Sequence, residues 1–142
     1  MDVSIELTAG DFSRAGTASS RIKKILKQLN VPPDIIKRVV IALYESEVNV
    51  VAHSYGGNVT CTITSEGIDI VVQDQGPGIP DIDLAMSEGY STASKEIREM
   101  GFGAGMGLPN IRKNVDALEI NSSENSPTTI SMHVKFTHTQ EE

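Results

Sequence analysis

The sequence predicts an α+β fold, a two-layer sandwich with one mostly antiparallel sheet and about three helices on one face of it. Two patterns lead to this prediction. Four segments alternate apolar and polar residues, which is typical of strands with one buried face, and three segments repeat apolar residues at spacings of three and four, which is typical of helices. Their order along the chain is strand, two helices, two hairpinned strands, a long irregular segment, a helix and a final hairpin.

The bulk properties fit one domain, expected over residues 1–136 of the 142, followed by a polar tail at 137–142. The hydrophobic content of 39% includes no Trp, so we expect an aliphatic core. The net charge of −7 argues against nucleic acid or an anionic membrane as a partner. A single cysteine, no signal-peptide pattern and no apolar run of roughly 20 residues favour a cytoplasmic location. That cysteine, Cys61, alternates with apolar residues and is expected in the core.

The first strand is expected at Val3–Thr8, and the first helix runs to about Leu29 with Asp11 or Ser13 as its cap. Basic residues gather on this helix at a spacing that predicts a solvated face, with docking of an acidic protein as the alternative. They are Arg21, Lys23, Lys24 and Lys27.

The second helix is expected from Pro32 to His53, because prolines favour a helix start. Glu45, Asn49 and His53 are spaced by four and therefore form one polar stripe. Glu47 lies two residues from Glu45 and is interpreted as solvated surface charge. The apolar line of this helix consists of Ile36, Val39, Val40, Leu43 and Val50.

A hairpin follows, with strands at 59–64 and 68–74 joined by a turn at Glu66-Gly67. Asp74 shares the buried face of the second strand, and an unpaired buried carboxylate is costly. Two interpretations remain open. Asp74 either caps the turn that follows or waits in a pocket for a donor such as the exocyclic amine of a ligand.

Glycine-rich segments flank the irregular segment 81–100, which we interpret as a lid. Gly76–Pro80 bends the chain tightly, and 101–109 places glycines at every second position before a helix expected at 108–118. Neither the Walker A pattern nor the dinucleotide pattern fits this run. A helix N-terminus after mobile glycines favours phosphate binding. The last strands are expected at 119–122 and 128–136.

Three motifs in this order resemble the boxes of the GHKL (Bergerat-fold) ATPases: Glu45-x3-Asn49, Asp74-x-Gly76-x-Gly78 and Gly103-x-Gly105-x-Gly107. Over about residues 3–136 the chain is most similar to the small anti-sigma factors that are also serine/threonine protein kinases. Tyr44–Tyr55 resembles the helix of that branch, and Gly89–Thr92 resembles its lid.

The resemblance implies ATP and Mg²⁺ as cofactors. Glu45 would be the catalytic base, Asn49 would hold Mg²⁺, and Asp74 would accept the adenine amino group. Thr128 would contact adenine, preferred over Thr129 for its inward position. The other expected nucleotide contacts are His53, Gly76, Gly78, Ile79, Ser91, Thr92, Lys95, Gly101, Gly103, Gly105, Gly107 and Leu108. The alternatives are a helix-end role for His53 and a solvated charge for Lys95.

The implied function is an ATP-dependent serine/threonine kinase and regulatory switch. It would phosphorylate a small anti-anti-sigma-type (STAS) protein and sequester a sigma factor as a second role, and a homodimer is compatible with it. The alternatives are an ATP-gated anti-sigma or regulator-binding module with little or no catalysis, and a detached histidine-kinase-like catalytic domain. The last is ranked lowest because histidine kinases commonly lack the Glu of the first box.

Overall fold

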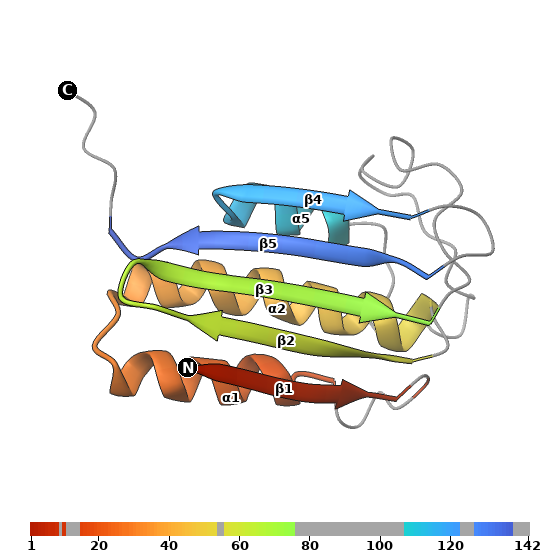
Figure 1. Cartoon of the computed structure of the whole chain (residues 1–142), viewed down its shortest axis with the longest axis horizontal. Helices are drawn as coiled ribbons and strands as arrows, with labels where there is room; N and C mark the ends of the chain where they lie inside the picture. Colours follow the sequence, from red (N-terminus) through yellow and green to blue (C-terminus); the bar gives the residue numbers. More distant parts are fainter. Residues whose placement is uncertain (9, 11–14, 54–55, 76–106, 123–126, 138–142) are drawn as a thin grey trace.

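The computed structural model describes residues 1–8, 10, 15–53, 56–75, 107–122 and 127–137. In these residues five strands form one antiparallel sheet, and three helices lie on one face of it (Figure 1). The predicted α+β sandwich is therefore confirmed.

The sheet has the strand order β1-β2-β3-β5-β4. Its strands are β1 (Asp2–Leu7), β2 (Gly57–Ile63), β3 (Gly67–Asp74), β4 (Ala117–Asn121) and β5 (Thr129–Lys135). The register aligns Val72 of β3 with Val59 of β2 and with Ile130 of β5, so buried side chains face buried side chains across the centre. This shared parity gives the sheet one apolar face, which the helices cover.

The helices are α1 (Thr17–Gln28), α2 (Pro33–His53) and α5 (Gly107–Asn114). In Figure 1, α2 runs behind the middle of the sheet, and it packs against both α1 and α5. Four residues of its predicted apolar line, Ile36, Val39, Leu43 and Val50, are confirmed as buried, whereas Val40 is half-buried. Cys61 is also fully buried, as predicted. The largest buried side chains of this aliphatic core are Ile22, Leu26, Ile35, Leu43, Ile68, Ile70 and Ile111.

Glu47 is not a solvated surface charge, because its side chain is 0% exposed. Its carboxylate accepts three backbone N–H groups at the start of α1: Oε2 from Gly16 at 3.0 Å and from Ala18 at 3.1 Å, and Oε1 from Ser19 at 2.7 Å. The first N–H groups of a helix have no partner within it, and the helix dipole favours negative charge there. Glu47 of α2 therefore caps α1 from outside.

This cap explains why α1 begins later than predicted. Its N-cap residue is Gly16, with a φ of 99° and no side-chain hydrogen bond of its own. The proposed caps Asp11 and Ser13 lie outside the described residues, and both precede the observed N-cap by several positions. A cap supplied by another helix leaves no local signal at the helix start.

The helix expected at 108–118 is also shorter than predicted. It ends at Asn114, where the backbone oxygen accepts a hydrogen bond from Arg38 Nε at 3.1 Å. The Asp116 N–H then donates to the His133 oxygen at 2.9 Å and joins the chain to the sheet, so β4 starts at Ala117. Leu118 belongs to this strand and not to the helix, although it still packs against the core.

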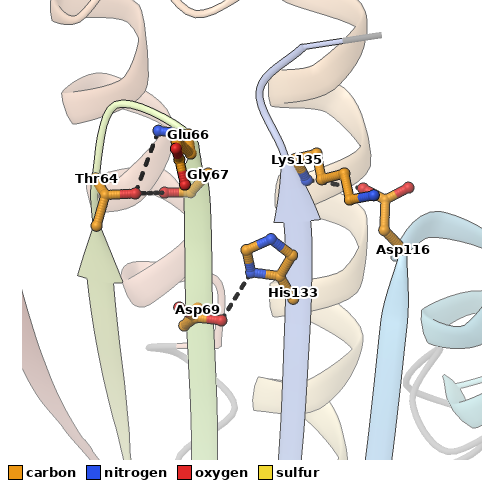
Figure 2. Close-up of polar contacts among 7 residues, drawn as sticks. All are labelled: Thr64, Glu66, Gly67, Asp69, Asp116, His133 and Lys135. Atoms are coloured by element: carbon orange, nitrogen blue, oxygen red, sulfur yellow. Dashed lines mark hydrogen bonds and ion pairs between the residues drawn. The ribbon is translucent and has the colours of Figure 1, made fainter. Parts of the chain in front are cut away.

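The hairpin between β2 and β3 is confirmed, with its turn one position earlier than predicted (Figure 2). The Thr64 N–H donates to the Gly67 oxygen at 3.0 Å, so Gly67 is already paired. A Cβ on Gly67 would lie 2.6 Å from the Val134 backbone oxygen. Glycine at this position therefore allows β5 to approach β3 closely.

Candidate functional site

The predicted site residues fall into two groups. The structure describes Glu45, Asn49, Asp74, Leu108 and Thr128, together with the backbone of His53 and Gly107 at helix ends. The side chain of His53 lies outside the described residues. So do Gly76, Gly78, Ile79, Ser91, Thr92, Lys95, Gly101, Gly103 and Gly105, and the predicted lid.

Glu45 and Asn49 lie on α2 where this helix packs against α5. Both side chains are half-buried, so they are accessible without being fully hydrated. The Asn110 side chain of α5 donates from Nδ2 to Glu45 Oε1 at 3.4 Å. This is a long hydrogen bond that holds the carboxylate weakly. The first half of α5 is thus brought beside the polar stripe of α2.

The start of α5 is anchored by apolar side chains. Gly107 is its first residue, Leu108 is 7% exposed and Ile111 is fully buried. The Leu108 side chain therefore faces the core. What this position can offer a ligand is its backbone, in the first turn of a helix where N–H groups are unpaired.

Asp74 is the last residue of β3, on the same side as the buried Ile70 and Val72. Its Oδ1 accepts the backbone N–H of Thr128 at 2.7 Å, while its own N–H donates to the Thr128 oxygen at 2.9 Å. In a continued antiparallel ladder the Thr128 N–H would bond to a backbone carbonyl. The carboxylate takes that role, which orients it across the end of β5.

Close packing around Asp74 depends on two neighbours. Gly57 is paired with Asp74 in the sheet, and a Cβ on Gly57 would lie 2.8 Å from the Asp74 Cα. On the other side, Thr128 is only 3% exposed and its hydroxyl is hydrogen-bonded to the hydroxyl of Ser122. The inward position predicted for Thr128 is thus confirmed, and it precedes β5 by one residue.

Sequence reasoning missed two residues near this site, Asn110 and Ser122, and also the buried position of Glu47 elsewhere on α2. Asn110 lies one turn into α5 and gives no motif signal of its own. Ser122 contacts Thr128 across a hairpin whose middle lies outside the described residues. Glu47 did carry a signal, since it follows the buried Leu43 by four positions and precedes the buried Val50 by three, which places it on the apolar side of α2.

The fold and these motifs define a class of protein. The chain belongs to the histidine kinase-like ATPase domain family, whose model matches residues 9–134. This match covers both the helix layer and four of the five strands, and it confirms the resemblance to the GHKL ATPases.

Relatives narrow the class to the branch that contains anti-sigma factors and serine/threonine kinases. The chain is 29% identical to the serine/threonine-protein kinase RsbT of Bacillus subtilis (strain 168) over 112 residues, 76% of this chain and 78% of RsbT. It is also 29% identical to the anti-sigma F factor of Clostridium novyi (strain NT) over 131 residues, 88% of this chain and 85% of that protein.

Two solved structures share the fold at low sequence identity. The RsbU and RsbW domains of Rv1364c from Mycobacterium tuberculosis match with a TM-score of 0.65 and 17% identity, over 94% of this chain and 32% of that one. The SiaB–SiaC complex from Pseudomonas aeruginosa contains a chain that matches with a TM-score of 0.56 and 11% identity, over 94% and 89% of the two chains. At this identity the likeness concerns the fold alone.

In the part of the chain that the structure describes, no helix has both the length and the apolar character that a membrane crossing requires.

Proposed function

We propose that this chain is an ATP-dependent serine/threonine protein kinase and switch protein, with residues 1–136 as one nucleotide-binding domain. Its substrate would be a hydroxyl side chain of a small STAS-type regulatory protein. The observation that carries this proposal is the position of Glu45 and Asn49 on α2, half-buried and beside the first half of α5. Phosphoryl transfer requires positioned groups of these kinds and little covalent chemistry from the protein.

Asp74 would recognise the adenine. Its carboxylate lies at the end of a buried strand face and is already oriented by the Thr128 N–H at 2.7 Å. A carboxylate held in this way can accept a hydrogen bond from an exocyclic amine, as an adenine offers. The buried Thr128 would lie beside the base, and Gly76 and Gly78 would allow it to approach the backbone.

Asn49 would hold Mg²⁺, which neutralises phosphate charge when it is bound. The donor set fits, because Mg²⁺ prefers oxygen ligands and usually combines one or two protein ligands with phosphate oxygens and water. Among the described residues no three His, Cys, Asp or Glu side chains form a metal cluster, so a metal here would depend on the nucleotide. The remaining expected contacts, His53, Lys95 and the glycines of 101–107, would surround the phosphates.

Glu45 would act as the general base. It lies one turn before Asn49, and within the described part of the chain it accepts a weak hydrogen bond from Asn110 at 3.4 Å. The carboxylate would take the proton of the substrate hydroxyl while that oxygen forms a bond to the γ-phosphorus. The bond to the bridging oxygen then breaks and ADP leaves, so charge and atoms balance.

A second candidate is an ATP-gated binding module that sequesters a sigma factor or another regulator. It is favoured by the names of the relatives, since the Clostridium novyi protein and several other relatives are anti-sigma F factors. The two functions can occur in one protein. They differ in whether Glu45 is needed for activity.

Thermal unfolding with and without millimolar Mg-ATP tests the nucleotide site. A ligand that binds only the folded state at about 100 times its Kd adds about 2.7 kcal/mol of stability. We expect a clear rise in Tm for the wild type and little or none for Asp74→Asn. An asparagine can still accept the Thr128 N–H, so this variant should fold.

Asp69→Asn is the matched control, because Asp69 lies on the same strand but is exposed on the other face, where it contacts His133 (Figure 2). It should keep the full response to Mg-ATP. No rise in Tm for the wild type, or an equal loss in both variants, would contradict the proposed site.

A further inference from the structure

A groove lies between the end of α1 and the start of α2, with a volume of about 630 Å³. Its apolar lining includes Val31, Val40 and Ile41. Val40 and Ile41 are half-buried in this chain, so part of their apolar surface is open to a partner. A contiguous patch of exposed apolar side chains marks a binding site more often than single exposed apolar residues do.

The groove is basic although the whole chain is acidic. Lys23 and Lys27 of α1 and Lys37 of α2 lie along it, and all three are exposed. The described residues that line it include no Asp or Glu. In a chain of net charge −7 this local excess of positive charge selects for negative partners.

We propose that this groove binds an acidic amphipathic helix of a partner protein. The lining contributed by α2 extends from Pro33 to Ile41, about 12 Å at 1.5 Å per residue, which matches between two and three turns of a helix. A helix laid into such a groove places apolar residues at i, i+3 or i+4 and i+7 on the floor. Its flanking Glu or Asp residues would then meet the three lysines.

The groove ends one turn before the proposed nucleotide site on α2. Its last lining residue, Ile41, precedes Glu45 by about 6 Å and Asn49 by about 12 Å along the helix at 1.5 Å per residue. None of the lining residues is an expected nucleotide contact, so the inference does not rest on nucleotide binding or on phosphoryl transfer. The proposed binding surface for a protein partner lies on α1 and α2, and it does not depend on the activity of the nucleotide site.

The test uses a 14-residue helical peptide with Leu at i, i+3, i+7 and i+10 and Glu at the flanking positions, added to the full ¹⁵N-labelled chain. We expect saturable binding with a Kd below about 1 mM and the largest amide shifts at Val31, Val40 and Ile41. Lys27→Glu should weaken binding at least fivefold, because charge reversal turns attraction into repulsion at the rim. Ile41→Gln should weaken it as well.

Lys24→Glu is the matched control, since Lys24 is an exposed lysine of α1 with the same charge change but does not line the groove. It should bind the peptide as the wild type does. The response to Mg-ATP in thermal unfolding, read on the same variants, should not change, so a failure here differs from a failure of the nucleotide site.

Several results would overturn the inference. They are no binding of the acidic peptide, equal binding of a peptide with Lys in place of Glu, and equal losses in Lys27→Glu and Lys24→Glu. Binding to phosphatidylglycerol vesicles in preference to the peptide would assign the groove to a membrane surface. Self-association that Lys27→Glu abolishes would assign it to a second copy of the chain.

Discussion

Glu45 and Glu47 are separated by one residue in α2, yet their carboxylates occupy opposite environments. Glu47 is fully buried and accepts three backbone N–H groups of α1. Glu45 is half-buried and, within the described residues, accepts a long hydrogen bond of 3.4 Å from the Asn110 amide of α5. Residues two apart on a helix point about 200° apart, so the same helix directs one acid into the helix layer and the other toward the site.

The two carboxylates differ in whether a ligand or substrate could reach them. Glu47 is fully buried with both oxygens directed at the start of α1, so a substrate cannot reach this carboxylate. Glu45 keeps acceptor capacity and partial access to solvent, which a general base requires. Burial and hydrogen bonding therefore separate a structural acid from a candidate catalytic acid better than residue type does.

The largest expected effect is on the reactivity of Cys61, which reports on the environment of Glu47. Burial, and then the negative charge of Glu47, raise the pKa of the Cys61 thiol from 9.0 to about 12. Since only the thiolate reacts, modification by a disulfide reagent at pH 7.5 should be about a thousandfold slower in the folded chain than in urea. Rates within about tenfold of each other would contradict the buried position.

The same shift predicts a pH dependence of stability. The thiol pKa is higher in the folded than in the unfolded chain, so the folded state binds the proton more tightly. Its contribution is fully present below pH 9 and is lost as the pH rises from 9 toward 12. The free energies of unfolding of the wild type and of Cys61→Ala, measured by chemical unfolding, should therefore differ less at alkaline pH than at neutral pH.

Replacement of Glu47 should give the next largest effect. Glu47→Ala removes the acceptor of three N–H groups, two of them buried and one part-buried, and we expect a loss of about 2–4 kcal/mol in the free energy of unfolding. Glu45→Ala is the control on the same helix and should lose less than about 1 kcal/mol. Urea unfolding of both variants measures the difference. Equal losses would mean that the two carboxylates are not distinguished as described.

Asp116 is a third carboxylate, which is hydrogen-bonded but not fully buried, and its expected effect on stability is smaller. Burial acts to raise its pKa, but the Lys135 N–H at 2.7 Å (Figure 2), the Arg38 guanidinium at 3.1 Å and the Lys135 charge together lower it. Because its folded pKa lies below the ordinary 3.8, its contribution is present above pH 3.8 and is lost as the pH falls further.

Arg38→Gln should cost less than about 1 kcal/mol at pH 7, because the two side chains are 32% and 31% exposed and solvent screens the pair. The cost should shrink below pH 3.8, as Asp116 becomes protonated. A cost that does not change with pH would assign the role of Arg38 to its hydrogen bond with the Asn114 oxygen, which does not titrate.

Most of the fold could be predicted because strand alternation and helix periodicity are local signals. The inward parity of Thr128 and the hairpin after Ile63 follow from residues close in sequence. The start of α1 could not be predicted in this way, since its cap is supplied by Glu47, 28 residues or more away in sequence. The end of α5 likewise depends on Arg38 of another helix.

The candidate site was predictable in its parts and not in its contacts. The spacing of Glu45 and Asn49 places them on one face of α2, and the parity of Asp74 places it on the buried face of β3. The Thr128 N–H that holds Asp74 comes from 54 positions further along the chain. Pairings of this length depend on the sheet order, which no single segment encodes.

The most direct test of this account is the turnover of Glu45→Gln, measured apart from its affinity for Mg-ATP. The account predicts affinity within a few-fold of the wild type and a fall of about 10²–10⁴ in phosphoryl transfer, with slow ATP hydrolysis as the reaction followed. Asp69→Asn, a matched loss of one carboxylate outside the site, should leave both quantities unchanged. Full turnover in Glu45→Gln, or a loss of affinity as large as the loss of turnover, would contradict a catalytic role for Glu45.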